Sequence, residues 1–269
     1  MLKDVAPTLR KSTLIVGYSK GEPHKGGFIP YGSAFCIYVE KHNYKVISEV
    51  ILPSHHLLKN LIKRKNIIDD ADGYFITNAH VLAPPSLGGK IIPPPNSILD
   101  FGRNEGFVGD LEWEGFGVSE ISILEVDKKS DVGLFKANFA LPPVKLKLDS
   151  EYPIGTTIGF NGYPFSDLRM TAITTSSGII SAYLLDRHRK PYVKMIQIDA
   201  MNHEGNSGGP LFLGETGEVI GVISSRFDPR YAEGASKIVR GRPIHERTNI
   251  SFAVSIDHAR PLLEKAGIL

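Results

Sequence analysis

Short apolar segments recur along most of the chain and are separated by glycine, proline, asparagine and aspartate. Apolar runs of about four to eight residues between such turn-forming residues are typical of β-strands. Helical periodicity, with apolar residues three and four positions apart, is convincing in two stretches only, 54–68 and 256–269. The sequence therefore predicts an all-β protein that ends in an α-helix. The expected strands are 13–16, 33–39, 45–51, 74–77, 121–126, 132–136, 156–159, 193–198, 210–213, 219–224 and 250–254.

The composition gives no indication of a nucleic-acid or membrane partner. The 269 residues are 42% hydrophobic and 22% charged, as in an ordinary globular protein. The net charge of +2 gives no overall attraction to nucleic acid or to an anionic membrane, so neither is implied as a partner. No apolar run reaches the roughly 18 residues of a membrane-spanning helix, and none is expected.

Cysteine usage and the first residues bear on the cellular location. Cys36 is the single cysteine, so no intramolecular disulfide forms, and its apolar surroundings predict a small buried side chain. Residues 1–7 lack the continuous apolar stretch of a secretory signal. Together these features predict a cytoplasmic protein.

The stretch Gly-Asn-Ser-Gly-Gly-Pro at residues 205–210 indicates a chemistry. Three glycines around Ser207 allow a turn in which backbone N–H groups converge and one hydroxyl is exposed. Covalent acyl transfer needs this combination of a nucleophile and an oxyanion hole. The alternative is a glycine-rich hairpin without chemistry.

A serine hydroxyl near neutral pH needs a base to take its proton and a third group to orient that base. An apolar strand delivers His80 at its end, and Asp131 opens another short apolar strand. Asp127 is the alternative to Asp131, which is preferred because it lies directly at the start of its strand. The order along the chain is histidine, aspartate, serine.

These segments together resemble the trypsin-like serine peptidases, and above all the disulfide-free branch of the HtrA/Deg peptidase domain. The resemblance covers Gly-Ser-Ala-Phe, Thr-Asn-Ala-His-Val, Asp-Val-Gly and the serine motif, at residues 32–35, 77–81, 131–133 and 205–210. Weaker matches lie at 158–165, 175–181, 196–200 and 250–254.

The resemblance implies two six-stranded antiparallel β-barrels with a C-terminal α-helix, which meet near residues 141–143. Residues 1–143 would form the N-terminal barrel with His80 and Asp131. Residues 144–269 would form the C-terminal barrel with Ser207 and the closing helix. Together they would make one peptidase unit with its active site between the barrels.

The resemblance also implies a role for each residue. Ser207 attacks the peptide carbonyl, His80 acts as base and then as acid, and Asp131 orients the imidazole. The N–H groups of Gly205 and Ser207 form the oxyanion hole, and glycine suits position 205 because φ > 0 is often needed there. The function expected is that of a serine endopeptidase that works through an acyl-enzyme.

The family pattern places a specificity pocket around Met201, with Ser224, Ser225 and Arg226 at its edge. An apolar floor at Met201 disfavours Lys or Arg at the cleaved position and favours small to medium apolar residues. Arg226 could line the pocket entrance, or its side chain could simply face the solvent, and the sequence leaves both possibilities open.

Activity is expected without cleavage of the chain. Relatives that are activated from zymogens place an aspartate before the serine, where it binds a new N-terminal ammonium. Asn206 lacks that charge. The triplet Ile-Val-Gly at 15–17 resembles the activated N-terminus of those enzymes, and we interpret it as a coincidence.

The sequence departs from the compact family pattern at three segments, 41–72, 83–118 and 226–249, which we interpret as insertions. The third is rich in basic residues and is either a solvated loop or a docking and regulatory loop. The PDZ domain of HtrA proteins is not expected within the sequence up to Leu269, and a regulatory protein partner is left open.

No cofactor or metal is expected, because the nearest nucleotide-binding and zinc-binding patterns are incomplete. The partner implied is a protein or peptide substrate. The competing hypothesis is a catalytically inactive trypsin-like module that serves as a protein-binding scaffold.

Overall fold

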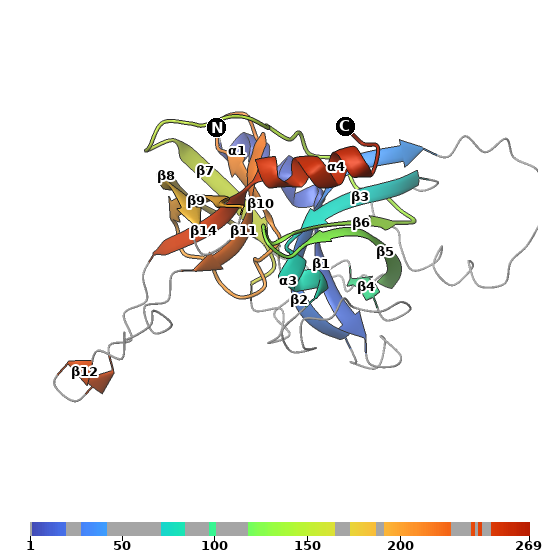
Figure 1. Cartoon of the computed structure of the whole chain (residues 1–269), viewed down its shortest axis with the longest axis horizontal. Helices are drawn as coiled ribbons and strands as arrows, with labels where there is room; N and C mark the ends of the chain where they lie inside the picture. Colours follow the sequence, from blue (N-terminus) through green and yellow to red (C-terminus); the bar gives the residue numbers. More distant parts are fainter. Residues whose placement is uncertain are drawn as a thin grey trace, which may run out of the picture.

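A computed structural model describes residues 2–19, 28–41, 71–83, 97–100, 118–164, 173–186, 191–226, 238–239, 242–243 and 249–269. These residues form two closed β-barrels of six strands each, shown in Figure 1, and every strand ladder within the barrels is antiparallel. The prediction of an all-β fold with two six-stranded barrels and a C-terminal helix is confirmed.

The first barrel has the strand order β1-β2-β3-β6-β5-β4. Its strands are β1 (Thr13–Ser19), β2 (Phe28–Lys41), β3 (Ala71–Thr77), β4 (Ser97–Asp100), β5 (Val118–Asp127) and β6 (Val132–Ala137). Phe75 and Phe135 stack in its core with ring centroids 5.2 Å apart. Cys36 is buried in the same core, and burial raises the pKa of its thiol to about 12, so the thiol stays protonated.

The second barrel has the order β10-β11-β14-β9-β8-β7. Its strands are β7 (Thr157–Gly162), β8 (Thr174–Asp186), β9 (Val193–Asp199), β10 (Pro210–Leu213), β11 (Val219–Arg226) and β14 (Ile250–Ser255). The short strands β12 (Ile238–Val239) and β13 (Arg242–Pro243) form a separate two-stranded sheet.

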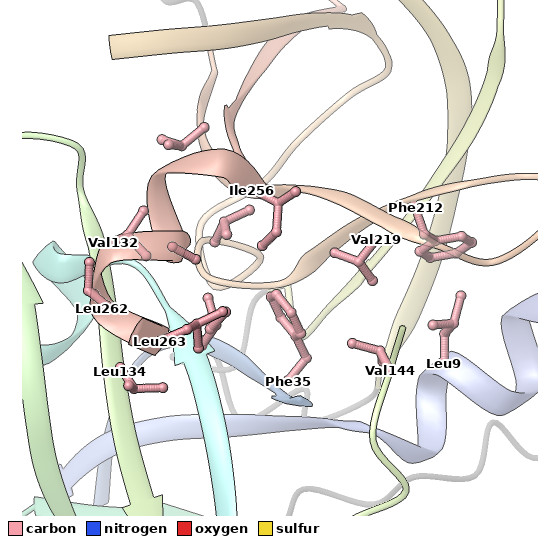
Figure 2. Close-up of a cluster of buried hydrophobic side chains, with 14 of the residues drawn as sticks. Leu9, Phe35, Val132, Leu134, Val144, Phe212, Val219, Ile256, Leu262 and Leu263 are labelled. Carbon is pink, nitrogen blue, oxygen red and sulfur yellow. The ribbon is translucent and has the colours of Figure 1, made fainter. Parts of the chain in front are cut away.

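An apolar cluster joins the two barrels. Phe35 of β2 lies among side chains of the second barrel and of the C-terminal helices, including Val219 and Leu263 (Figure 2). The helices are η5 (Ile256–Ala259), a 3₁₀ turn, and α4 (Arg260–Lys265). Both follow the last strand of the second barrel and contact β6 of the first, so the end of the chain bridges the barrels.

The closing helix is shorter than predicted, because its last turn ends in a glycine cap. Gly267 has φ +70°, its N–H donates to Glu264 O, and the N–H of Ile268 donates to Leu263 O. This is the Schellman arrangement, which terminates a helix and satisfies its free carbonyl groups. The helix therefore does not extend to residue 269.

An N-terminal helix, α1 (Leu2–Lys11), was not expected from the sequence. Its buried side chains Ala6 and Leu9 belong to the cluster that also holds Phe212 and Val219 of the second barrel. The helix thus packs on the second barrel, although the chain enters β1 of the first barrel directly after it.

The interpretation of 83–118 as an insertion is incomplete, because residues 97–100 form β4, which pairs with both β1 and β5 and closes the first barrel. Most of 41–72, with the expected strand 45–51 and helix 54–68, lies outside the described residues. Of 226–249, the structure describes only Arg226, β12, β13 and Asn249. None of the described helices is long and apolar enough to cross a membrane.

Candidate active site

His80 and Asp131 come together because their strands are neighbours. His80 lies in a one-turn helix, α3 (Ala79–Leu82), that follows β3 after Asn78. Asp131 directly precedes β6, and β3 pairs with β6 in a register that places Thr77 opposite Gly133. The ladder therefore brings the end of one strand beside the beginning of the other.

The two side chains make a two-point contact. His80 Nδ1 lies 3.0 Å from Oδ1 and 2.9 Å from Oδ2 of Asp131, and the His80 backbone N–H donates to Oδ1 at 3.0 Å. A carboxylate accepts hydrogen bonds, so Nδ1 carries a proton, and in the uncharged form of the ring Nε2 is the nitrogen that can take up a proton. The Asp131 side chain is 12% exposed and that of His80 is 36% exposed. The pair thus has a protected carboxylate and an accessible imidazole.

Asp131 stays ionised although it is buried. Burial opposes its charge, but hydrogen bonds from His80 and from Ser224 Oγ, which donates to Oδ2 at 2.9 Å, outweigh this effect and hold the pKa of Asp131 below its usual value. Its backbone has φ +60°, and its carbonyl accepts a bond from Asn78 Nδ2 at 2.9 Å. A buried asparagine thus braces an uncommon backbone conformation.

Asp127, the alternative to Asp131, makes its hydrogen bonds elsewhere. Asp127 accepts the backbone N–H of Lys129 at 2.9 Å and the hydroxyl of Ser130 at 2.6 Å. These bonds cap the turn between β5 and β6 and leave Asp131 as the aspartate that contacts His80.

Ser207 is linked to this pair through Ser224. The Ser207 hydroxyl donates to the Ser224 carbonyl at 2.8 Å, and the Ser224 hydroxyl donates to Asp131. Among the described residues, no hydrogen bond joins Ser207 Oγ to His80. Proton transfer between them therefore requires the Ser207 side chain to rotate away from the Ser224 carbonyl.

The turn before Ser207 leaves two N–H groups unused. Asn206 N donates to His203 O at 3.1 Å, and Gly205, at the third position of this turn, has φ +95°. That is the pattern of a type II turn, which needs a positive φ at its third residue, as expected for Gly205. Within the described part of the chain, the N–H groups of Gly205 and Ser207 donate to no protein group. Both can donate a hydrogen bond to a ligand oxygen.

Glycine is also required directly after Ser207. Gly208 has φ +87°, and a Cβ there would lie 2.0 Å from Ser33 O and 2.2 Å from Thr77 Oγ1. The serine turn is packed directly against strands of the other barrel, so a larger residue at 208 has no room.

The expected specificity pocket is only partly described. Met201 follows β9 and is 38% exposed, so the side chain is not enclosed. Ser224 is buried in β11. Ser225 and Arg226 pair with Phe252 and Ser251 of β14, and their side chains lie outside the described part of the structure. In the described part of the chain, no group of three His, Cys, Asp or Glu residues is placed to hold a metal ion.

Sequence comparison decides the family. The model of the trypsin-like peptidase domain matches residues 67–222, more than half of the chain. The chain belongs to the trypsin-like peptidase family. Two curated relatives are named as probable periplasmic serine endoproteases of the DegP-like type. That of Ectopseudomonas mendocina is 35% identical over 162 residues, and that of Hahella chejuensis is 32% identical over 154 residues.

These matches cover 60% and 57% of this trypsin-like chain, but only 28% and 27% of the relatives, so the chain aligns with about a quarter of their length. A solved HtrA-type protease with a tripeptide has the same fold. It matches with a TM-score of 0.60 and 18% identity, over 100% of this chain and 64% of the other. The resemblance to HtrA-type peptidases is confirmed.

The prediction of a cytoplasmic location is wrong, because the curated relatives are named as periplasmic. A single cysteine is a poor guide to compartment, since a protein with a large apolar core does not need disulfides even where they can form.

Sequence reasoning missed two residues of the site. Ser33 and Asn78 were quoted only as parts of family motifs, yet both bond to the backbone around the expected catalytic residues. Ser224 was assigned to the pocket edge, and nothing in the sequence indicated that its hydroxyl also donates to Asp131. The motifs contained the signal, because a polar residue inside an apolar strand needs a partner when it is buried.

Proposed function

We propose that this chain is a serine endopeptidase of the HtrA/DegP type that uses His80, Asp131 and Ser207. The observation that carries the proposal is the bond of His80 Nδ1 to the buried Asp131 carboxylate, in a network that reaches Ser207 through Ser224. A buried, ionised carboxylate fixes the imidazole tautomer and stabilises the imidazolium that forms during proton transfer.

The reaction proceeds in two halves. Ser207 Oγ bonds to the peptide carbonyl carbon while its proton passes to His80 Nε2, and the tetrahedral adduct then expels the amine, which takes that proton. Water adds to the resulting ester with His80 again as base, and the acid product leaves as Ser207 regains its proton. The free N–H groups of Gly205 and Ser207 hold the negatively charged oxygen of each adduct. Each such donor contributes about 3 kcal/mol in related sites.

The substrate is a protein or peptide. The names of the relatives support a periplasmic location for this chain. We place the specificity pocket around Met201, with Ser224, Ser225 and Arg226 at its edge. The apolar Met201 favours cleavage after small or medium apolar residues over cleavage after Lys or Arg. Profiling with a peptide library measures this preference, and dominant cleavage after Arg or Lys would contradict it.

Labelling with a fluorophosphonate tests the function directly. The purified chain is expected to gain one phosphonyl group by intact mass, on the peptide that contains Ser207. Ser207→Ala should abolish labelling and peptide cleavage, whereas Ser150→Ala, at a serine outside the site, should change neither. A folded wild-type chain that is neither labelled nor active would favour the scaffold hypothesis.

A further inference from the structure

Ser33 binds the turn that carries Ser207, although it belongs to the other barrel. It lies in β2 and is fully buried. Its N–H donates to the Ser207 carbonyl at 2.7 Å, and its hydroxyl donates to the Gly205 carbonyl at 2.7 Å. One residue thus holds two carbonyl groups of the turn, about 170 positions further along the chain.

Ser33 is itself held from both sides. Its hydroxyl accepts the N–H of Tyr163 at 3.1 Å, and its carbonyl accepts the Thr77 hydroxyl at 2.7 Å. A serine hydroxyl has one proton to donate, and here that proton goes to Gly205. The bond from Tyr163 therefore orients the Ser33 hydroxyl, whereas the bond from Thr77 acts on the backbone of β2.

The two carbonyl groups that Ser33 holds alternate with the two N–H groups of the proposed oxyanion hole. The Gly205 carbonyl belongs to the peptide between residues 205 and 206, and the Ser207 carbonyl belongs to that between 207 and 208. The Ser207 N–H belongs to the peptide between 206 and 207, which lies between these two. Because peptide units are planar, fixing both neighbours restricts the direction of the middle N–H.

The Gly205 N–H belongs to the peptide between residues 204 and 205. The following peptide is held by the bond from Ser33 to the Gly205 carbonyl, and the preceding one by the bond from Asn206 N to the His203 carbonyl. Glycine has the widest choice of backbone conformations, so Gly205 and Gly208 make this turn flexible by themselves. The turn has to be held in one conformation if its N–H groups are to point at a single oxygen. An oxyanion hole works through donors that are already oriented before the charge develops.

We propose that Ser33 is a positioning residue that orients the oxyanion hole from the opposite barrel through its hydroxyl group. This inference depends on the proposed function, because it assigns the Gly205 and Ser207 N–H groups to that hole. Ser33 contacts neither substrate nor reacting atoms and acts through the turn.

The test compares two buried hydroxyl groups of adjacent strands. Ser33→Ala removes the bond to Gly205, whereas Thr77→Val removes the bond to Ser33 O and leaves both turn carbonyls held. For each variant the unfolding temperature is measured, together with the second-order rate of reaction with a fluorophosphonate well below that temperature. Ser33→Thr, which keeps the hydroxyl, serves as the rescue variant.

Loss of one hole donor costs about 10²–10³ in rate, and Ser33 acts indirectly, so Ser33→Ala should react about 10-fold to 100-fold more slowly than wild type. The pH midpoint of the reaction should stay unchanged, since His80 and Asp131 are untouched. Thr77→Val should keep most of the rate at a comparable loss of stability, and Ser33→Thr should recover much of it.

Equal losses of rate in Ser33→Ala and Thr77→Val at equal losses of stability would overturn the proposal, because Ser33 would then act only on stability. A shifted pH midpoint would also overturn it, since the base would be perturbed. If wild type reacts and Ser33→Ala reacts as fast, this inference alone fails. If folded wild type does not react, the proposed function fails.

Discussion

The histidine and the aspartate of the site differ from the serine in how firmly they are placed. His80 contacts the Asp131 carboxylate from both Nδ1 and its backbone N–H, whereas Ser207 Oγ is bonded to a backbone carbonyl. The proposed base is thus oriented in advance, whereas the proposed nucleophile must rotate away from the Ser224 carbonyl to meet it. Such a rotation between staggered positions is fast compared with turnover of a typical peptidase.

Replacing Asp131 by asparagine should inactivate the enzyme without unfolding it. The amide cannot stabilise an imidazolium, and it can present an N–H to Nδ1, which selects the wrong tautomer. The same exchange lowers kcat by about 10⁴ in enzymes with this triad. Asp127→Asn is the matched control, because it removes a carboxylate from the turn but not from His80. Peptide cleavage by both variants measures the difference, and equal activity of the two would contradict the assignment.

At the level of single residues, the sequence identified what local motifs encode. His80, Asp131 and Ser207 each stand at a fixed offset from an apolar strand, and the structure brings the first two together. The hydrogen bonds of Ser33 and Asn78 could not be predicted, because they depend on partners that only the closed fold brings near. Bonds between distant residues leave no periodic trace in the chain.

Among the secondary-structure elements, the sequence predicted strands that are bounded by turn-forming residues. It did not predict α1 and β4, whose local patterns are ambiguous. The period of Leu2, Val5, Ala6 and Leu9 fits α1, but Pro7 inside the helix obscured it. The strand β4 has only four residues and lies between a segment rich in proline, 84–96, and one rich in glycine, 101–117. Its assignment depends on pairing with β1 and β5, which a local pattern does not contain.

The 3₁₀ turn η5 contains a histidine whose protonation should weaken the fold. His258 Nε2 accepts the Lys194 backbone N–H at 2.8 Å, and a protonated ring cannot accept it. Burial lowers the pKa of His258, against the effect of Asp257 and Asp127. The folded state therefore binds fewer protons than the unfolded state. The stability that neutral His258 contributes is complete above its unfolded pKa of about 6.5, and it is lost as the pH falls from there through the lower pKa of the folded state.

Unfolding temperatures between pH 8 and pH 5 measure this effect. The wild-type protein should lose more stability on acidification than His258→Gln, whose side chain can accept the same bond at every pH. Curves that run parallel over the whole range would show that His258 does not contribute.

The helix α4 should stabilise both barrels through Leu263, which is fully buried in the junction cluster. Leu263→Ala should lower the free energy of unfolding by about 2–5 kcal/mol, the usual range for such a truncation in a core. Glu264→Ala, at the exposed neighbour, should change it by about 0.5 kcal/mol or less. Urea denaturation followed by fluorescence gives both values, and similar losses would mean that the helix packs loosely.

At the scale of the whole molecule, the two-barrel architecture followed from the resemblance rather than from strand patterns alone. Strand patterns give a list of segments, and their order around each barrel needs the pairing of distant segments, such as β10 with β7. The division at residue 143 stays a prediction, and α1 complicates it because this helix belongs to the first half of the chain and packs on the second barrel.

The intact chain should be active without cleavage before Ile15. Ile15 is almost fully buried within β1, where it pairs with Ser33 on one side and Asp100 on the other. Cutting the preceding bond would detach α1 and shorten β1, so it should destabilise the protein instead of activating it. Intact mass after fluorophosphonate treatment identifies the reactive species. Reaction only by a form that begins at Ile15 would contradict this prediction.

Ser33 and Phe35 are two residues apart on β2, so they project from the same face of the strand. Ser33 bonds to the turn before Ser207, and Phe35 lies in the apolar cluster between the barrels (Figure 2). We therefore expect movement of Phe35 in this cluster to reach the turn of Ser207 through two residues of β2. Substitutions that merely loosen this packing are expected to slow turnover at temperatures where the protein is still fully folded.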